Sequence, residues 1–273
     1  MFPLDKKYNF LMPIKAKKLA RIGGRNGDGG YIVEMNSLKN TEILVSFGMG
    51  QDWSFELEFI KENPDIKIFM YDHNVSALLY LKEVWKYFRR YITFRDKNEG
   101  LKTRINFLKN YLNFFKIKNV NFYKEKITYP IKSNKDADIK KVFERIDSNK
   151  DMVGKKIFLK CDIEGDEFNI INEILKYEKR INALIFEFHW LDKNEEIFLK
   201  FMKRIQKNFY ILHLHGNNHF GQLITGLPIV LEVSLINKIN LTNEKYFIKT
   251  FPVKGLDKPN NPSKDDINFY FDV

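Results

Sequence analysis

The segment KKIFLKCDIEGDEFNII holds four acidic residues within six positions, directly after a run of apolar residues. These four are Asp162, Glu164, Asp166 and Glu167. Clustered carboxylates can hold a divalent cation or act as general bases. If the strand persists, alternation places Asp162 and Glu164 on one side. Asp166 and Glu167 fit a different interpretation better, because acids favour the positive N-terminal end of a following helix.

Histidines add a second group of candidates. The chain has five, and four of them stand at the ends of predicted strands, namely His73, His189, His213 and His215, with His219 in the next loop. Asp162, His189 and His215 would form a two-histidine, one-carboxylate set, which suits a divalent metal with open positions. The alternative is that each histidine is structural, since no close spacing motif supports the set.

A glycine loop follows an earlier strand. FGMG contains Gly48 and Gly50, small residues that let the backbone approach a ligand closely. Asp72 ends the next strand, where an acid can hydrogen-bond a ribose. Trp53 stands where the dinucleotide fingerprint needs its third glycine, which favours S-adenosylmethionine (SAM) over a nicotinamide cofactor. Ser54 is a plausible N-cap of the next helix. Alternatively, the glycine pair forms only a tight turn.

The elements that must position these residues alternate between strands and helices. We expect strands within 41–50, 67–74, 120–127, 157–165, 181–190, 209–219 and 227–236. We expect helices within 53–63, 77–92, 167–180 and 195–208. This alternation predicts an α/β fold with a mostly parallel, doubly wound sheet. The last two strands follow each other without a helix and could form an antiparallel edge.

The organisation favours one domain over residues 1–273. Residues 1–40 form an N-terminal extension with a short strand near Tyr31, and 235–273 an irregular C-terminal tail rich in Pro, Asn and Asp. The charged region 132–151 is expected to be a loop with a short helix. Aromatic residues, at 15%, could supply an interface as easily as a core, so a homo-oligomer is left open.

The net charge of +11 allows an anionic partner, although scattered lysines also fit a solvated surface. The single cysteine, Cys161, excludes a disulfide within the chain and fits a reducing compartment. Residues 1–20 lack an apolar signal core, and no stretch is long enough to span a bilayer. We therefore expect a cytoplasmic protein with no membrane span.

FGMGQDWSFE, MYDHN, LKCDIEGDE, FEFH and HLHGNN, in this order, resemble the FkbM-type SAM-dependent methyltransferases. DGGY, from Asp28 to Tyr31, resembles a branch found in bacterial capsule and surface-polysaccharide clusters. The resemblance implies a Rossmann-like class I methyltransferase fold. The cofactor residues expected are Asp28, Gly29, Gly30, Gly48, Gly50, Ser54, Asp72 and Asp162.

The activity implied is SAM-dependent O-methylation of a sugar hydroxyl, on a nucleotide sugar or a capsular or surface-polysaccharide precursor. Some related enzymes use a divalent metal, and here His189 stands where an acid is expected, which suits iron or manganese as well as magnesium. Asp162, His189 and His215 are the expected ligands. Glu164 or Glu187 would either hydrogen-bond to these ligands or serve as the general base. Without a metal, His215 or His189 would be the base.

Other interpretations stay open. The enzyme could methylate a capsule phosphoramidate substituent or nucleic acid, or the chain could be a non-catalytic carbohydrate-binding homologue. We expect no nucleic acid, because no binding module is appended. Asn217 and Asn218 could bind sugar hydroxyls or only stabilise a turn. Arg21 and Arg25 are candidates for holding the diphosphate of a nucleotide sugar.

Overall fold

The computed structural model of the chain describes residues 2–24, 27–93, 98–241 and 246–273. Its centre is a seven-stranded sheet in the order β11-β12-β10-β9-β4-β5-β6. The bounds are β4 Ile43–Phe47, β5 Lys67–Tyr71, β6 Val120–Tyr123, β9 Ile157–Cys161, β10 Ile181–Phe188, β11 Phe209–Gly216 and β12 Leu231–Asn237. The predicted strands are confirmed, except that 120–127 splits into β6 and a short strand of a separate sheet.

Burial on both faces explains why these strands read as continuous apolar runs. Every residue of β4, β9 and β10 is buried. The pairs β4–β5, β4–β9, β5–β6 and β9–β10 are parallel, whereas β12 is antiparallel to both β10 and β11. The predicted antiparallel pair is confirmed, but the reversed strand is β12, one position in from the edge.

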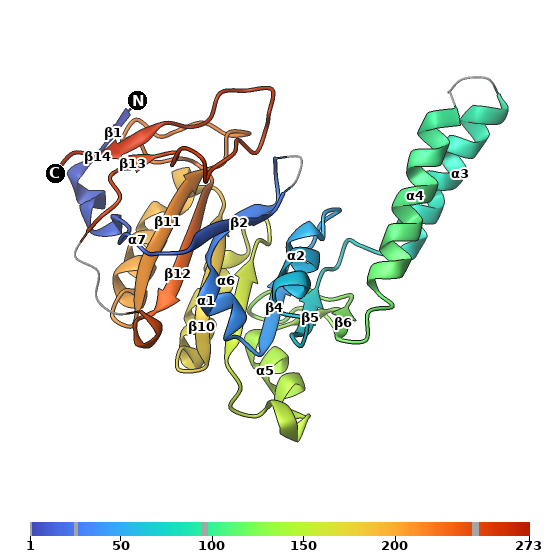
Figure 1. Cartoon of the computed structure of the whole chain (residues 1–273), viewed down its shortest axis with the longest axis horizontal. Coiled ribbons are helices and arrows are strands. Elements are labelled where there is room, and N and C mark those ends of the chain that lie inside the picture. The colour runs from blue at the N-terminus through green and yellow to red at the C-terminus, as the bar shows by residue number, and fades with distance from the viewer. Residues whose placement is uncertain (1, 25–26, 94–97, 242–245) are drawn as a thin grey trace.

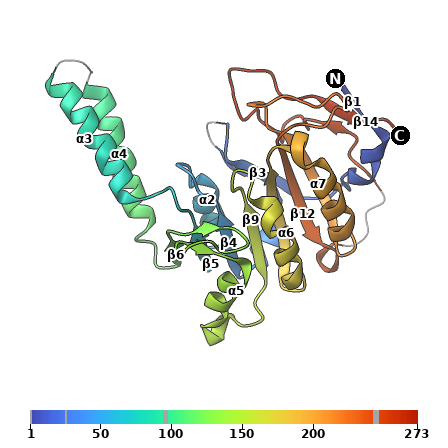
Figure 2. The same cartoon turned by 180° about the vertical axis from the view of Figure 1, so that it is seen from behind.

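Helices cover both faces of the sheet (Figures 1 and 2). On one face the core includes side chains from α5 Ile139–Asp147, α6 Glu167–Ile174 and α7 Leu191–Ile205. On the other it includes side chains from α1 Met35–Lys39 and α2 Ser54–Glu62. The prediction of a doubly wound sheet is confirmed, and so is the short helix within 132–151.

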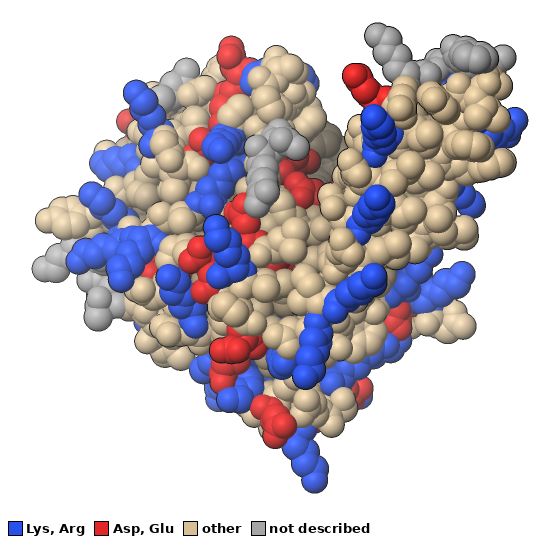
Figure 3. Space-filling view, turned by 45° about the vertical axis from the view of Figure 1, so that its right-hand side comes forward, with Lys and Arg blue, Asp and Glu red and all other residues tan. Residues whose placement is uncertain are grey.

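Two long helices project from the sheet as a hairpin (Figures 1 and 2). α3 spans Ala77–Ile92, as predicted, and α4 spans Asn98–Phe114. The sequence prediction missed α4, because its exposed side is rich in asparagine, a weak helix former. Figure 3 shows this hairpin on the right, with Lys and Arg along its borders.

Small sheets attach the ends of the chain to the domain. The remaining strands are β1 Phe2–Leu4, β2 Leu19–Gly23, β3 Gly30–Glu34, β7 Lys126–Ile127, β8 Asp136–Ala137, β13 Thr250–Phe251 and β14 Phe269–Phe271. The 3-10 helices are Lys6–Leu11, Lys150–Met152, Leu175–Tyr177 and Lys238–Asn240. β1 pairs with β14, so the first and last strands lie side by side. Among the described residues, no helix has both the length and the apolar character needed to cross a bilayer.

Candidate active site

A cavity of about 600 Å³ lies at the carboxyl ends of β4, β5, β9 and β10. This volume is typical of small-molecule sites. In open α/β sheets, ligands bind at this edge because the loops that follow the strands converge there. The predicted residues that line the cavity include Asp28, Gly29, Gly48, Gly50, Asp72, Asp162, Glu164, Glu187 and His189.

The glycine loop after β4 is held in place by Asp72. One carboxylate oxygen of Asp72 accepts hydrogen bonds from the backbone N–H groups of Met49 and Gly50. The other accepts from Asn74 and Val75. Four backbone donors therefore occupy the acceptor sites of this buried carboxylate. Asp72 shapes the loop, and its predicted contact with a ribose stays a prediction.

Gly48 and Gly50 both adopt positive φ angles, +73° and +58°, but their surroundings differ. A Cβ atom on Gly48 would lie 1.6 Å from the carbonyl oxygen of Asp162. A Cβ atom on Gly50 would meet nothing within 4 Å. Gly48 thus allows the loops after β4 and β9 to touch, whereas Gly50 borders open space in the cavity.

Two further predicted cofactor residues do not line this cavity. Gly30 is buried at the start of β3. Ser54 is the first residue of α2 and not its N-cap, and its hydroxyl accepts a hydrogen bond from the N–H of Gly24. Arg21 donates to the carbonyl of Gly27, and Arg25 lies outside the described residues.

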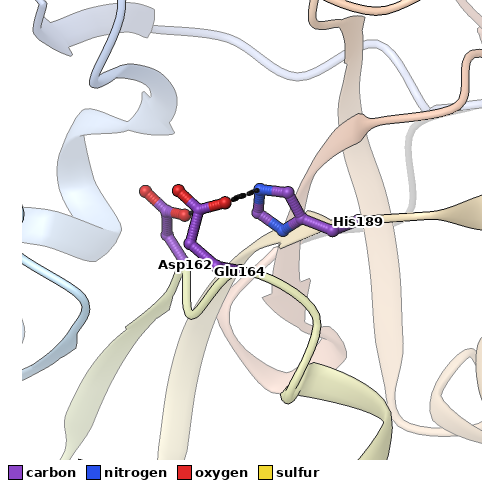
Figure 4. A group of neighbouring side chains, drawn as sticks. All are labelled: Asp162, Glu164 and His189. Atoms are coloured by element: carbon purple, nitrogen blue, oxygen red, sulfur yellow. Dashed lines mark ion pairs between the residues drawn. The ribbon is translucent and has the colours of Figure 1, made fainter.

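Asp162, Glu164 and His189 form a group whose potential ligand atoms lie within 4.8 Å of one another (Figure 4). Nε2 of His189 lies 3.6 Å from Glu164 Oε2 and 4.0 Å from Asp162 Oδ1. These distances are too long for hydrogen bonds. Donor atoms around a divalent ion at about 2 Å lie roughly 3 Å apart, so a small closure would complete the set.

The loops that carry Glu164 and His189 are linked. Glu164 has a φ of +58°, in the left-handed region that a residue with a side chain seldom adopts. Trp190, next to His189, has a φ of +57°. A Cβ atom on Gly165 would lie 3.1 Å from the Trp190 indole, so a larger residue would require the indole to shift, and the φ of +107° at Gly165 also favours glycine. Strained residues in both loops are typical of functional sites.

Glu167 orients the imidazole of His189 through a hydrogen bond. His189 Nδ1 lies 3.0 Å from Glu167 Oε1. A carboxylate only accepts, so Nδ1 carries the proton and Nε2 faces the acids. Burial alone would lower the pKa of His189, but this hydrogen bond and the charges of Glu167, Glu187 and Asp162 raise it to about 10. The sequence interpretation of Glu167 as a helix-end acid missed this contact.

Tyr31, the last residue of DGGY, lies beneath the cavity. Its hydroxyl is 2.8 Å from Asp162 Oδ2 and 3.0 Å from Glu187 Oε2. Burial raises the pKa of Glu187 well above its usual value, and the Asp162 charge adds to this. The Tyr31 hydroxyl has one hydrogen, so it donates to one of these two carboxyl groups at a time. Asn217 donates to the other oxygen of Glu187.

Lys160 is a buried cation that the sequence interpretation did not single out. Its ammonium donates to the Gly48 carbonyl at 2.7 Å and lies 3.8 Å from Asp162. Burial alone would lower the pKa of Lys160, but the charges of Asp162, Glu56 and Glu187 raise it. Lys160 therefore stays charged and links the glycine loop to the acid after β9.

His215 is not part of the group, which corrects the predicted metal set. Its Nδ1 lies 3.2 Å from Glu232 on β12, and its Nε2 lies 3.1 Å from Asp266 of the tail. Burial alone would lower the pKa of His215, but these two partners raise it to about 10. His213 bonds to Asp257 in the same way. Both histidines attach the tail to β11 instead of facing the cavity.

The remaining candidates divide between the cavity and the tail. His73, Asn217 and His219 line the cavity. Asn218 instead donates to three tail carbonyls and accepts from the N–H of Asn261. Asn218 is therefore a structural residue that holds the tail against the loop after β11.

The cavity is acidic although the protein is basic. Among the described residues, eight acids and two lysines line it. The acids are Asp28, Asp52, Asp72, Glu125, Asp162, Glu164, Asp166 and Glu187, and the lysines are Lys126 and Lys160. This wall favours cationic or neutral ligands and disfavours polyanions.

No protein-family model matches this chain, and no curated protein does. Similar solved structures include a precorrin-6y C5,15-methyltransferase from Geobacter metallireducens, 13% identical, with a TM-score of 0.36 over 75% of this chain and 86% of that one. A SAM-dependent methyltransferase from Aquifex aeolicus is 10% identical, with a TM-score of 0.32 over 74% of this chain and 87% of that one. Likenesses this weak carry no argument about activity.

The strand order and the single reversed strand decide the fold class. The chain has a Rossmann-like class I methyltransferase fold. The FkbM-type relationship and the surface-polysaccharide branch stay predictions from the sequence motifs.

Proposed function

We propose that this protein is a SAM-dependent O-methyltransferase that acts on a sugar hydroxyl with the help of a divalent metal. One observation carries the proposal. A single acidic cavity at the carboxyl edge of a class I methyltransferase sheet joins a glycine loop to the Asp162, Glu164 and His189 group. The choice of a surface-polysaccharide precursor as acceptor rests on the sequence resemblance.

The cofactor side of the cavity is the loop 48–52 with Asp72 and the DGGY segment. Gly50 fits a bound nucleoside, since its missing side chain leaves the cavity open at that point. Asp28 and Gly29 line the same space. SAM supplies, when bound, a methyl group activated by its sulfonium. The acidic wall favours that positive charge over an uncharged or anionic cofactor.

The acceptor side is the Asp162, Glu164 and His189 group, and Glu164 replaces His215 in the proposed metal set. The donors fit a divalent cation, because two carboxylates and one oriented imidazole face one point. A cation there favours the deprotonated form of an acceptor hydroxyl. The side chain of Glu164 is 80% exposed, so its second oxygen is available to pass the proton to water.

The neutral sugar is favoured over nucleic acid by charge. Acids outnumber lysines on the cavity wall and disfavour a phosphate backbone, although Glu125 and Asp166 are ion-paired. Arg21, a candidate for phosphate binding, is turned to the Gly27 carbonyl. His219, which is exposed and lines the cavity, provides a hydrogen-bonding group for hydroxyls, and Asn217 holds the backbone of His219 through its side-chain oxygen. An acceptor that carries a phosphoramidate is the second candidate, since Lys126 also lies on the wall.

Calorimetric titration tests the proposal. Chelator-treated protein is titrated with S-adenosylhomocysteine (SAH), and separately with manganese, ferrous iron and magnesium. We expect SAH binding and one metal site. The metal site is lost in His189→Ala and Glu164→Ala and kept in His215→Gln, while SAH binding survives in all three. A metal site lost only in His215→Gln contradicts the set, and absence of SAH binding contradicts the function.

Turnover then separates the remaining candidates. Methyl transfer from labelled SAM is measured to nucleotide sugars, to phosphoramidate-bearing glycans and to oligonucleotides. We expect transfer to a sugar hydroxyl. Transfer only to oligonucleotides would identify a nucleic-acid methyltransferase, and SAH binding without transfer to any acceptor would identify a silent homologue.

A further inference from the structure

The α3–α4 hairpin exposes an apolar face that nothing in the described chain covers. On α3, five large side chains repeat at alternating spacings of three and four residues and are 41% to 60% exposed: Leu78, Leu81, Trp85, Phe88 and Ile92. On α4 the same repeat holds Leu101, Ile105, Leu108 and Leu112, of which Leu112 is exposed and the other three are partly buried. The exposed apolar area therefore lies mainly on α3. Such a repeat forms a stripe along one side of a helix.

Both stripes lie on the same side of the hairpin. α3 and α4 meet through Tyr80 on α3 and Phe107 and Tyr111 on α4, whose rings are in contact. At about 100° per residue, each stripe is turned roughly a third of a circle from that contact. The helices run in opposite directions, so the two turns bring the stripes to one face.

The opposite face of the hairpin looks toward the catalytic domain. Leu79 and Glu83 line a pocket together with Gln51 of the glycine loop. Asn110 and Asn113 line another pocket with the same loop. The apolar face therefore points away from the domain, where it can contact a binding partner without blocking the cavity.

Basic side chains border the apolar face on both edges. Lys82, Lys86 and Arg89 lie along the outer edge of α3, and Lys102 and Lys109 along the outer edge of α4. All five are exposed. Figure 3 shows the uncharged band between two rows of blue side chains. Together the two helices have seven Lys or Arg and two Glu.

We propose that this hairpin docks on an anionic lipid surface, with the apolar face at the acyl boundary and the basic edges on the headgroups. Apolar faces with aromatic residues, flanked by Lys and Arg, bind membrane interfaces in this way. A second copy of the chain fits less well. Face-to-face pairing would bring basic edges against basic edges in either orientation, which like charges oppose. The inference does not depend on the proposed reaction.

Vesicle sedimentation tests the docking. We expect the full chain to bind phosphatidylcholine vesicles that contain phosphatidylglycerol, and not vesicles of phosphatidylcholine alone. Leu81→Gln with Trp85→Gln should weaken binding at least tenfold. The matched control, Ile224→Gln with Ile239→Gln, changes two exposed apolar residues away from the hairpin and should bind within twofold of the wild type.

A charge series provides the second arm. Neutralising Lys82, Arg89 and Lys109 with Gln should weaken binding on the order of a hundredfold. The control neutralises three lysines on other helices or loops, Lys140, Lys176 and Lys200, which have exposed side chains. It should change binding less than fivefold. If both charge variants bind equally, net charge alone is responsible and the proposal is overturned.

The depth to which the apolar face enters the bilayer is measured by the fluorescence of Trp85. Vesicles with brominated acyl chains should quench part of the tryptophan fluorescence, and Trp85→Phe should remove the quenched part. No binding to anionic vesicles overturns the proposal. If the protein does not bind vesicles, sedimentation equilibrium shows what the face contacts instead. A dimer that Leu81→Gln with Trp85→Gln dissociates would mean that the apolar face joins two copies of the chain, and this result also overturns the proposal.

Discussion

Alanine at Gly48 and at Gly50 should have very different consequences, although the two substitutions are chemically identical. Both glycines have positive φ angles, which cost a residue with a side chain about 1–2 kcal/mol. Gly50→Ala should lose about that amount of unfolding free energy, because its Cβ meets open space.

Gly48→Ala has a steric cost as well. Its Cβ would lie 1.6 Å from the Asp162 carbonyl oxygen and 2.7 Å from the carbonyl carbon, so backbone must move. The movement disturbs the bond from Asp162 N–H to the Phe47 carbonyl and the one from Lys160 to the Gly48 carbonyl. Each lost bond costs roughly 1 kcal/mol. Together with the backbone cost, the total is about 3–4 kcal/mol.

Urea denaturation followed by circular dichroism measures both losses, and SAH titration reports on the cavity. Gly50→Ala places a methyl group in the space proposed for the nucleoside, so SAH affinity should fall, while the loss of stability stays at the backbone cost of about 1–2 kcal/mol. Gly48→Ala should lose both. Unfolding free energies within 1 kcal/mol of each other would refute the close contact between the two loops.

Three further substitutions test the buried polar groups. Tyr31→Phe removes the hydroxyl beside Asp162 and should cost about 1–3 kcal/mol in urea denaturation, whereas unchanged stability would contradict that bond. Lys160→Met leaves buried carboxylates unbalanced and should cost about 3–5 kcal/mol in the same assay; a stabilised variant would contradict it. For His215 the raised pKa stabilises the folded state below the ordinary pKa of 6.5, and this is lost as pH rises through about 10. A shift of that size corresponds to about 5 kcal/mol. The stability gap between wild type and His215→Gln should shrink from pH 6 to pH 10, and a constant gap would contradict the cause.

The sheet and half of the candidate site could be predicted from sequence because they depend on local signals. Apolar runs that end in glycine or an acid mark the strands, and parallel strands bring their carboxyl ends to one edge. Asp162 and His189 follow β9 and β10, which are neighbours, and so they come together. The positions of the strand ends were therefore sufficient to predict that Asp162 and His189 lie close together.

His215 shows where such reasoning stops. It lies near the end of β11, as predicted, but β12 inserts between β10 and β11. Strands lie about 4.8 Å apart, so His215 is two spacings from the strand of His189. The insertion also supplies Glu232, which takes one ring nitrogen. Strand order is a tertiary property that the spacing of residues in the chain does not reveal.

Tyr31 and Glu167 were missed for a related reason. Tyr31 lies 131 residues from Asp162 in the chain and reaches it only because β3 packs beside the sheet. Glu167 carries the expected signature of a helix-end acid, and its contact with His189 depends on how α6 meets β10. The motif DGGY pointed to the correct segment but not to the hydroxyl that contacts Asp162.

The distribution of charge bears on how the net charge of +11 is interpreted. That value allows an anionic partner of any kind, yet the cavity wall has eight acids and two lysines among the described residues. The basic side chains concentrate elsewhere, including the two edges of the α3–α4 hairpin (Figure 3). A polyanion drawn to the basic surface would be repelled at the proposed site of methyl transfer. In the proposed docking an anionic lipid surface contacts only the hairpin, so the docking is compatible with an acidic cavity that would receive the proposed cationic cofactor and neutral acceptor.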